Sequence, residues 1–99
     1  MKETDIQRAI LEYLALRKVF HWRNNSGAYK TATGGFIRYG TLGSPDIMCC
    51  VNGNLVGLEV KQPGGRQSDH QKAFEAGLLA AGGRYHVVHS IDEVQGLGL

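Results

Sequence analysis

Two carboxylates and a lysine stand at spacings that suit metal-assisted hydrolysis. Asp46 follows a proline, and Glu59 and Lys61 flank Val60 in an acid–any–lysine triplet. In a strand, side chains alternate between the two faces, so Glu59 and Lys61 project together. Two nearby carboxylates repel each other unless a proton or a cation lies between them. Oxygen ligands without sulfur or paired histidines favour Mg²⁺ or Mn²⁺, and a neighbouring lysine can orient a water or neutralise a phosphate.

An isolated Glu-x-Lys triplet is more often an ion pair on the wet face of an antiparallel sheet. The preceding Pro-Asp pair favours the metal site instead. Residues 46–51 and 55–61 are predicted to be strands joined by an Asn-Gly-Asn turn. Pairing around this turn places Asp46 beside residue 60 or so. We therefore expect Asp46, Glu59 and Lys61 to converge at one end of the hairpin.

The elements that must position these residues follow a mixed α/β pattern. The sequence predicts a helix over 3–17, strands over 19–24, 46–51 and 55–61, a helix over about 69–81, a strand over 84–89, and a short final turn or helix. Residues 25–35 read as a polar loop, and residues 36–39 as a brief strand inside it. The order α-β-β-β-α-β predicts a mixed sheet covered by two main helices, an α/β sandwich.

The first helix has an apolar stripe that includes Ile6, Ile10 and Leu14, and Glu3 falls within it. A carboxylate aimed at the core needs a metal or a base as its partner. Alternatively, Glu3 stays wet in the first turn, where the helix dipole favours an acid. Both readings remain open at this point.

The second helix begins with a capping-box pattern, Ser68-x-x-Gln71, and ends at a glycine pair. At helical spacing, one face collects its apolar and small residues. This predicted apolar face consists of Ala73, Phe74, Gly77, Leu78 and Ala81.

Composition excludes several classes of protein. Of the 99 residues, 42% are hydrophobic and 20% are charged, which is typical of a globular domain and not of a disordered chain, a collagen or a coiled coil. No run approaches the roughly 20 apolar residues of a membrane span, and the N-terminus has no signal-peptide pattern. The two cysteines are adjacent, which encodes neither a disulfide framework nor a zinc site. We expect one intracellular, cytoplasmic domain over residues 1–99, without a membrane partner.

The charge distribution is more informative than the net charge of +2. No acid occurs between Glu12 and Asp46, whereas basic and aromatic residues alternate there. Such a segment suits a polyanion, or it is an ordinary solvated surface with some core aromatics. The residues are Arg17, Lys18, Phe20, Trp22, Arg23, Tyr29, Lys30, Phe36, Arg38 and Tyr39.

These motifs together resemble a known nuclease family. The Pro-Asp pair followed by Glu59-Val60-Lys61 resembles the PD-(D/E)xK signature, and a longer string resembles its VRR-Nuc (virus-type replication-repair nuclease) branch over nearly the whole chain. That string is Gly43-Ser44-Pro45-Asp46-Ile47, Gly57-Leu58-Glu59-Val60-Lys61, Gly64, Gln67-Ser68, Gln71-x-x-Phe74 and Gly82-Gly83.

The resemblance implies a restriction-endonuclease-like fold and Mg²⁺- or Mn²⁺-dependent cleavage of DNA. Asp46 and Glu59 would be metal ligands together with the Val60 carbonyl, and Lys61 would orient the attacking water. Glu3 fits the N-terminal helical acid of this superfamily, a further candidate ligand.

Gln71 fits a glutamine that such nucleases place beside the site. Helix capping alone would also explain this residue.

The resemblance also implies a homodimer that resolves four-way (Holliday) junctions, as small stand-alone phage and bacterial members do. For phosphate contacts we single out Arg23, Lys30, Arg38 and Arg66. Substrate choice is expected to reside in residues 34–40. The alternatives are a nuclease for flaps, other DNA structures or RNA, a non-catalytic nucleic-acid-binding module, and an interaction protein with a coincidental motif.

Overall fold

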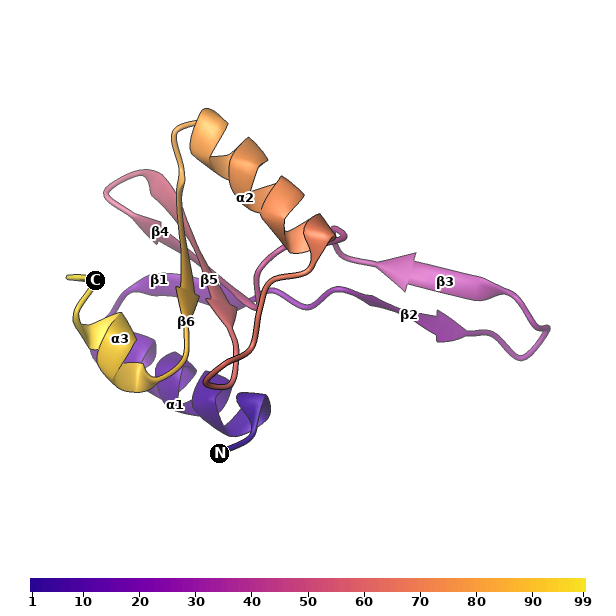
Figure 1. The fold of residues 1–99 in the computed structure, drawn as a ribbon, viewed down its shortest axis with the longest axis horizontal. Helices are drawn as coiled ribbons and strands as arrows, with labels where there is room; N and C mark the ends of the chain where they lie inside the picture. Colours follow the sequence, from indigo (N-terminus) through magenta and orange to yellow (C-terminus); the bar gives the residue numbers. More distant parts are fainter.

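The computed structural model describes all residues from 1 to 99 (Figure 1). In chain order, the helices and strands are α1 (Glu3–Leu16), β1 (Phe20–Arg23), β2 (Gly27–Lys30), β3 (Phe36–Tyr39), β4 (Ile47–Val51), β5 (Asn54–Val60), α2 (Asp69–Ala80), β6 (Arg84–Val88) and α3 (Ile91–Gln95).

The main sheet has four strands in the order β1-β4-β5-β6. The pairs β1–β4 and β4–β5 are antiparallel, and β5–β6 is parallel because α2 forms the crossover between them. Asn52 and Gly53 both have positive φ, 52° and 82°, as the tight turn between β4 and β5 requires. The predicted α/β class with a mixed sheet and flanking helices is confirmed.

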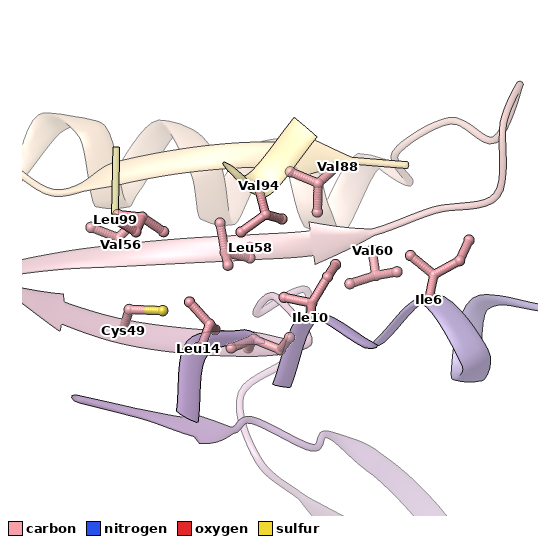
Figure 2. Packing of buried hydrophobic residues seen from close by; sticks show 11 residues of the cluster. Ile6, Ile10, Leu14, Cys49, Val56, Leu58, Val60, Val88, Val94 and Leu99 are labelled. Atoms are coloured by element: carbon pink, nitrogen blue, oxygen red, sulfur yellow. The ribbon is translucent and has the colours of Figure 1, made fainter. Parts of the chain in front are cut away.

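The hydrophobic core lies between the sheet and the pair α1 and α3. Figure 2 shows Ile6, Ile10 and Leu14 pointing from α1 toward strand residues such as Leu58 and Val60. Ile10, Leu14 and Leu58 are completely buried. Val94 of α3 and Leu99 close the other side of this cluster. The core therefore covers one face of β5 and leaves the opposite face, which carries Glu59, toward α2.

The prediction of a polar loop over residues 25–35 is wrong in part. Residues 27–30 form β2, which pairs with β3 in a separate two-stranded sheet. Figure 1 shows this hairpin extending away from the main sheet. All eight of its strand residues are exposed, so it lacks the alternation of buried and exposed positions by which a strand is predicted.

Helix α2 lies on the other face of the sheet and contains no buried residue. Of its predicted apolar face, Phe74 and Leu78 are half-buried, whereas the three small residues, Ala73, Gly77 and Ala81, are exposed. The small residues were wrongly assigned to a packed face, because α2 contacts chiefly β6 at the sheet edge. None of the helices has the length and apolar character needed to cross a membrane.

Candidate active site

Asp46 and Glu59 meet at the end of the β4–β5 hairpin. Ile47 pairs with Leu58, so the register places Asp46 level with residue 59, one position from the expected residue 60. The Val60 N–H donates to Asp46 Oδ2 at 2.8 Å. This hydrogen bond fixes the Asp46 carboxylate against the strand that carries Glu59, as the spacing predicts.

The Pro-Asp pair is held in place by Asn24, which follows β1, and by close packing against β5 and α2. The Asn24 side-chain amide donates to the Pro45 carbonyl at 2.9 Å, and the Asn24 N–H donates to the Asp46 carbonyl at 2.7 Å. Beneath the proline ring lies Gly57, where an added Cβ would stand 2.8 Å from Pro45 Cγ. Gly43 contacts the His70 carbonyl of α2 so closely that no side chain fits between them. Asn24 is thus a positioning residue, which the Pro-Asp motif alone does not reveal.

Glu59 is the most constrained group of the site. Its side chain is only 3% exposed, and its Oε2 accepts a 3.0 Å hydrogen bond from Gln71 Nε2. Lys61 Nζ lies 3.8 Å from the same oxygen. The other oxygen, Oε1, is buried and has no hydrogen-bond partner. Glu59 Oε1 is therefore a buried carboxylate oxygen that can still accept a hydrogen bond or coordinate a cation.

Gln71 does more than cap its helix. Its Oε1 accepts from the Ser68 N–H at 2.8 Å, and Ser68 Oγ accepts from the Gln71 N–H at 3.2 Å, which completes the predicted capping box. Because the amide oxygen is engaged by Ser68, the amide nitrogen faces Glu59. The two readings of Gln71, capping and contact with the site, hold together.

The electrostatics of the pair favour a bound proton or cation. Burial, followed by the charge of Asp46, raises the pKa of Glu59 to about 8, and these two effects together outweigh the lowering by Lys61. A cation placed between the carboxylates would remove the repulsion and release the proton.

The donor set fits a hard divalent cation. Asp46 and Glu59 supply carboxylate oxygens, and Glu59 Oε1 has no other partner. The Val60 N–H faces Asp46, and since the N–H and C=O of a strand residue point to the same side, its carbonyl is expected to face Asp46 too. No cluster of three His, Cys, Asp or Glu side chains is present. The candidate ligand set is thus two carboxylates and one carbonyl.

Glu3 does not point into the core. It is exposed in the first turn of α1, so its position in the apolar stripe was misleading and the wet alternative holds. Its charge nevertheless contributes to the raised pKa of Glu59. The structure therefore gives Glu3 an electrostatic influence on the site and no direct contact with the carboxylate pair.

The four basic residues singled out from the sequence lie in different places. Arg38 lines the hollow that also contains Asp46 and Gln71, and Lys30 projects from the same face of the β2–β3 hairpin as Arg38. Arg23 lines a smaller hollow against α1, on the side of the sheet away from Glu59. Arg66 is exposed in the loop before α2.

Two further buried polar groups border the site, and no sequence motif identifies them. The Tyr85 hydroxyl and Ser44 Oγ are buried without hydrogen-bond partners. Burial, with smaller effects from the charges of Glu59, Glu75 and Asp46, raises the pKa of Tyr85 to about 12. Tyr85 pairs with Gly57 across the sheet, which brings it to the face that carries Glu59.

Comparisons with known proteins add nothing to this description: no family model, no curated protein and no solved structure was found to match the chain.

Proposed function

We propose that the protein is a divalent-metal-dependent endonuclease that hydrolyses phosphodiester bonds in structured DNA, and that it resolves four-way junctions as a homodimer. The observation that carries the catalytic part is the convergence of Asp46, Glu59 and Lys61, with Gln71 bonded to Glu59. The order α1-β1-β4-β5-α2-β6, apart from the inserted hairpin, agrees with the restriction-endonuclease-like fold that the motifs imply.

A structural role alone accounts poorly for this cluster. A buried carboxylate, Glu59, beside a half-buried one, Asp46, destabilises a fold, as the raised pKa of Glu59 indicates. An ordinary ion pair on a wet sheet face would leave Glu59 exposed, but its side chain is only 3% exposed. Buried, mutually repelling acids beside a lysine are characteristic of sites that bind a cation or a proton for chemistry.

Each residue has a role in the proposed hydrolysis. Asp46, Glu59 and the Val60 carbonyl would hold Mg²⁺ or Mn²⁺, which when bound stabilises the negative charge that develops on the phosphate. The Lys61 ammonium, 3.8 Å from Glu59 Oε2, would donate a hydrogen bond to the attacking water and offset phosphate charge. Gln71 keeps the Glu59 carboxylate in position, so that its second oxygen faces the reacting groups. Attack in line with the leaving 3′ or 5′ oxygen then breaks the P–O bond, and a proton from water passes to that oxygen.

Apolar surface supports the dimeric part of the proposal. Phe20, Trp22 and Leu55 lie on the α2 side of the sheet, and they are 72%, 42% and 43% exposed. Phe20 and Trp22 pack edge to face, with ring centroids 6.4 Å apart. A patch of this kind is typical of an interface. A two-fold dimer presents two sites to two strands, which is the symmetry of a four-way junction.

The experiment is a cleavage assay on labelled four-way junction, flap, linear duplex and an RNA hairpin, each with Mg²⁺, Mn²⁺ or EDTA. We compare the wild type with Lys61→Ala and with Lys72→Ala, an exposed lysine of α2 that serves as the matched control. We expect metal-dependent nicking of the junction in symmetric pairs. Lys61→Ala should lose about 10²- to 10⁴-fold in rate, and Lys72→Ala should keep the wild-type rate.

Other results would change the proposal in defined ways. Cleavage of a flap or of RNA in preference to the junction would keep the site and reject the junction assignment. If the protein binds DNA in EDTA but cleaves none of the substrates with either metal, it is a nucleic-acid-binding module and not an enzyme. A melting temperature that Mn²⁺ leaves unchanged, with no cleavage, would reject the metal site altogether, because a ligand of the native state must raise it.

A further inference from the structure

The β2–β3 hairpin has two chemically different faces. Its register pairs Ala28 with Arg38 and Lys30 with Phe36, so these four side chains share one face. The opposite face carries Gly27, Tyr29, Ile37 and Tyr39, with the two tyrosine rings 6.4 Å apart. We call the first the basic face and the second the tyrosine face. The basic face combines two cations with one aromatic ring.

The basic face leads directly into the candidate active site. An open hollow of about 490 Å³ is lined at the base of the hairpin by Ala28 and Arg38 of the basic face and by Gly27 and Tyr39 of the tyrosine face, and beyond the hairpin by Asp46 and Gln71. One surface thus runs from the carboxylate of Asp46 along the basic face toward the hairpin tip. Figure 1 shows the hairpin extending beyond the start of α2, which agrees with this direction.

The charges along this surface suit a polyanion. The segment that forms the hairpin contains no acid, since none occurs between Glu12 and Asp46. Lys30 and Arg38 are diagonal neighbours across the strand pair, a relation that corresponds to about 7–8 Å. The N-terminus of α2 faces the same hollow and adds a partial positive charge.

Phe36 indicates which form of nucleic acid fits. It is 72% exposed, pairs with Lys30 across the hairpin and does not belong to the hydrophobic core, so burial in the core does not account for its ring. Exposed aromatic rings between basic side chains bind unpaired bases by stacking, whereas a paired duplex offers no free base face along its length. From Tyr39, at the base of the hairpin, to Phe36 the strand rises about 10 Å. Stacked nucleotides rise about 3.4 Å each, so Phe36 lies about three nucleotides from the base of the hairpin.

We infer that the β2–β3 hairpin is a nucleic-acid-binding arm that holds a strand with unpaired bases beside the scissile phosphodiester. Phe36 stacks on an unpaired base, and Lys30 and Arg38 contact its flanking phosphates. The inference rests on the proposed nuclease function and deepens it, because it requires the base pairs at the branch point, next to the cleaved bond, to open so that Phe36 stacks on an unpaired base; a four-way junction opened at its centre and a fork both meet this requirement.

The test is binding in EDTA, which needs no catalysis. Fluorescence anisotropy compares a splayed DNA fork with a fully paired duplex of the same length, for the wild type and for three Phe36 variants. The wild type should prefer the fork. Phe36→Ala and Phe36→Leu should weaken fork binding about 5- to 150-fold and change duplex binding less than about twofold, and Phe36→Trp should retain fork binding.

Two controls separate the arm from a general effect. Tyr29→Ala alters the tyrosine face of the same hairpin, where Tyr29 is 54% exposed, and should leave fork binding within about twofold of the wild type. The double variant Lys30→Ala/Arg38→Ala should weaken the binding of both DNA forms. The plot of log K against the logarithm of the salt concentration should become less steep, by about 1.5 in slope.

Equal losses in Phe36→Ala and Tyr29→Ala, or a wild type that binds fork and duplex alike, would overturn the inference. If the protein cleaves DNA but Phe36→Ala binds the fork normally, the arm fails and the nuclease stands. If nothing is cleaved but the Phe36 series behaves as expected, the nuclease fails and the arm stands.

Discussion

Gln71 Nε2 donates a hydrogen bond to Glu59 Oε2 at 3.0 Å, while the other end of the same amide closes the capping box on the Ser68 N–H. One side chain thereby ties the start of α2 to the buried acid of β5. The helix cap uses the amide oxygen of Gln71, so the amide nitrogen is the atom that remains to contact Glu59.

The first prediction separates these two tasks of Gln71. Gln71→Ala loses both contacts, whereas Ser68→Ala loses only the hydroxyl that caps the helix. Both variants should lower the free energy of unfolding by about 1 kcal/mol. Only Gln71→Ala should lower the cleavage rate, by about tenfold or more, since a hydrogen bond to a charged group is lost. Equal rates in the two variants would assign Gln71 to capping alone. Urea denaturation and single-turnover cleavage provide the two measurements.

The second prediction concerns pH. The pKa of Glu59 is about 8 in the folded protein, against 4.5 for the ordinary group. Between these values the native state keeps a proton that the unfolded chain has lost, so stability falls as pH rises. The contribution of Glu59 is therefore most favourable below about pH 4.5, decreases up to about pH 8 and is constant above it. Denaturation in EDTA between about pH 5 and 9 measures the slope.

Glu59→Gln provides the control for this pH dependence. It cannot titrate, so its stability should change less with pH and should exceed that of the wild type near pH 8. An unchanged slope would show that other groups set the pH dependence. Because a cation competes with the proton, Mn²⁺ should also bind the wild type more tightly as pH rises toward about 8.

The third prediction compares two glycines. At Gly57 a Cβ would stand 2.8 Å from the Pro45 ring, whereas at Gly77 of α2 nothing lies within 4 Å. Gly57→Ala should displace Pro45 and with it Asp46, which costs about 1–3 kcal/mol and weakens metal binding. Gly77→Ala should stabilise the protein by up to about 1 kcal/mol, because alanine favours a helix. Thermal melts with and without Mn²⁺ distinguish the two, and a Gly57→Ala variant that responds normally to Mn²⁺ would contradict the proposed packing.

The fourth prediction concerns Asn24. Asn24→Asp keeps the size of the side chain but removes the N–H that donates to the Pro45 carbonyl. The carbonyl is then unpaired, so we expect a loss of about 1–3 kcal/mol in stability and a lower cleavage rate. Asn25→Ala, at an exposed neighbouring position, should change neither quantity. An unchanged cleavage rate in Asn24→Asp would mean that Asp46 does not need the hydrogen bond from the Asn24 side chain to Pro45.

The carboxylate pair was predictable because strand alternation and a tight turn are local rules. Asp46 and Glu59 belong to one hairpin, and its register follows from the Asn52-Gly53 turn. Strand β2 was not predictable, since Gly27–Lys30 is exposed on both faces and carries no pattern of burial.

The remaining differences have a similar cause. Glu3 has the helical direction of Ile10 but lies in the first turn, where direction does not ensure burial. Arg23 and Arg38 look alike in the sequence, but pairing with Ile47 turns Arg23 to the α1 side of the sheet, whereas Arg38 borders the site. Which face a basic residue occupies depends on its partner strand, and the sequence does not specify that partner.

Helix α2 has no buried residue, which has a consequence for the dynamics of the molecule. A segment with so little buried surface opens at a lower free energy than the global unfolding transition. Amide hydrogens of α2 should therefore exchange with deuterium much sooner than those of β5, while β4 and β5 remain paired. Simultaneous exchange of the two segments would contradict this. Since Gln71 leaves Glu59 whenever α2 detaches, the exchange rate of this one helix reports how often the hydrogen bond between Gln71 and Glu59 is broken.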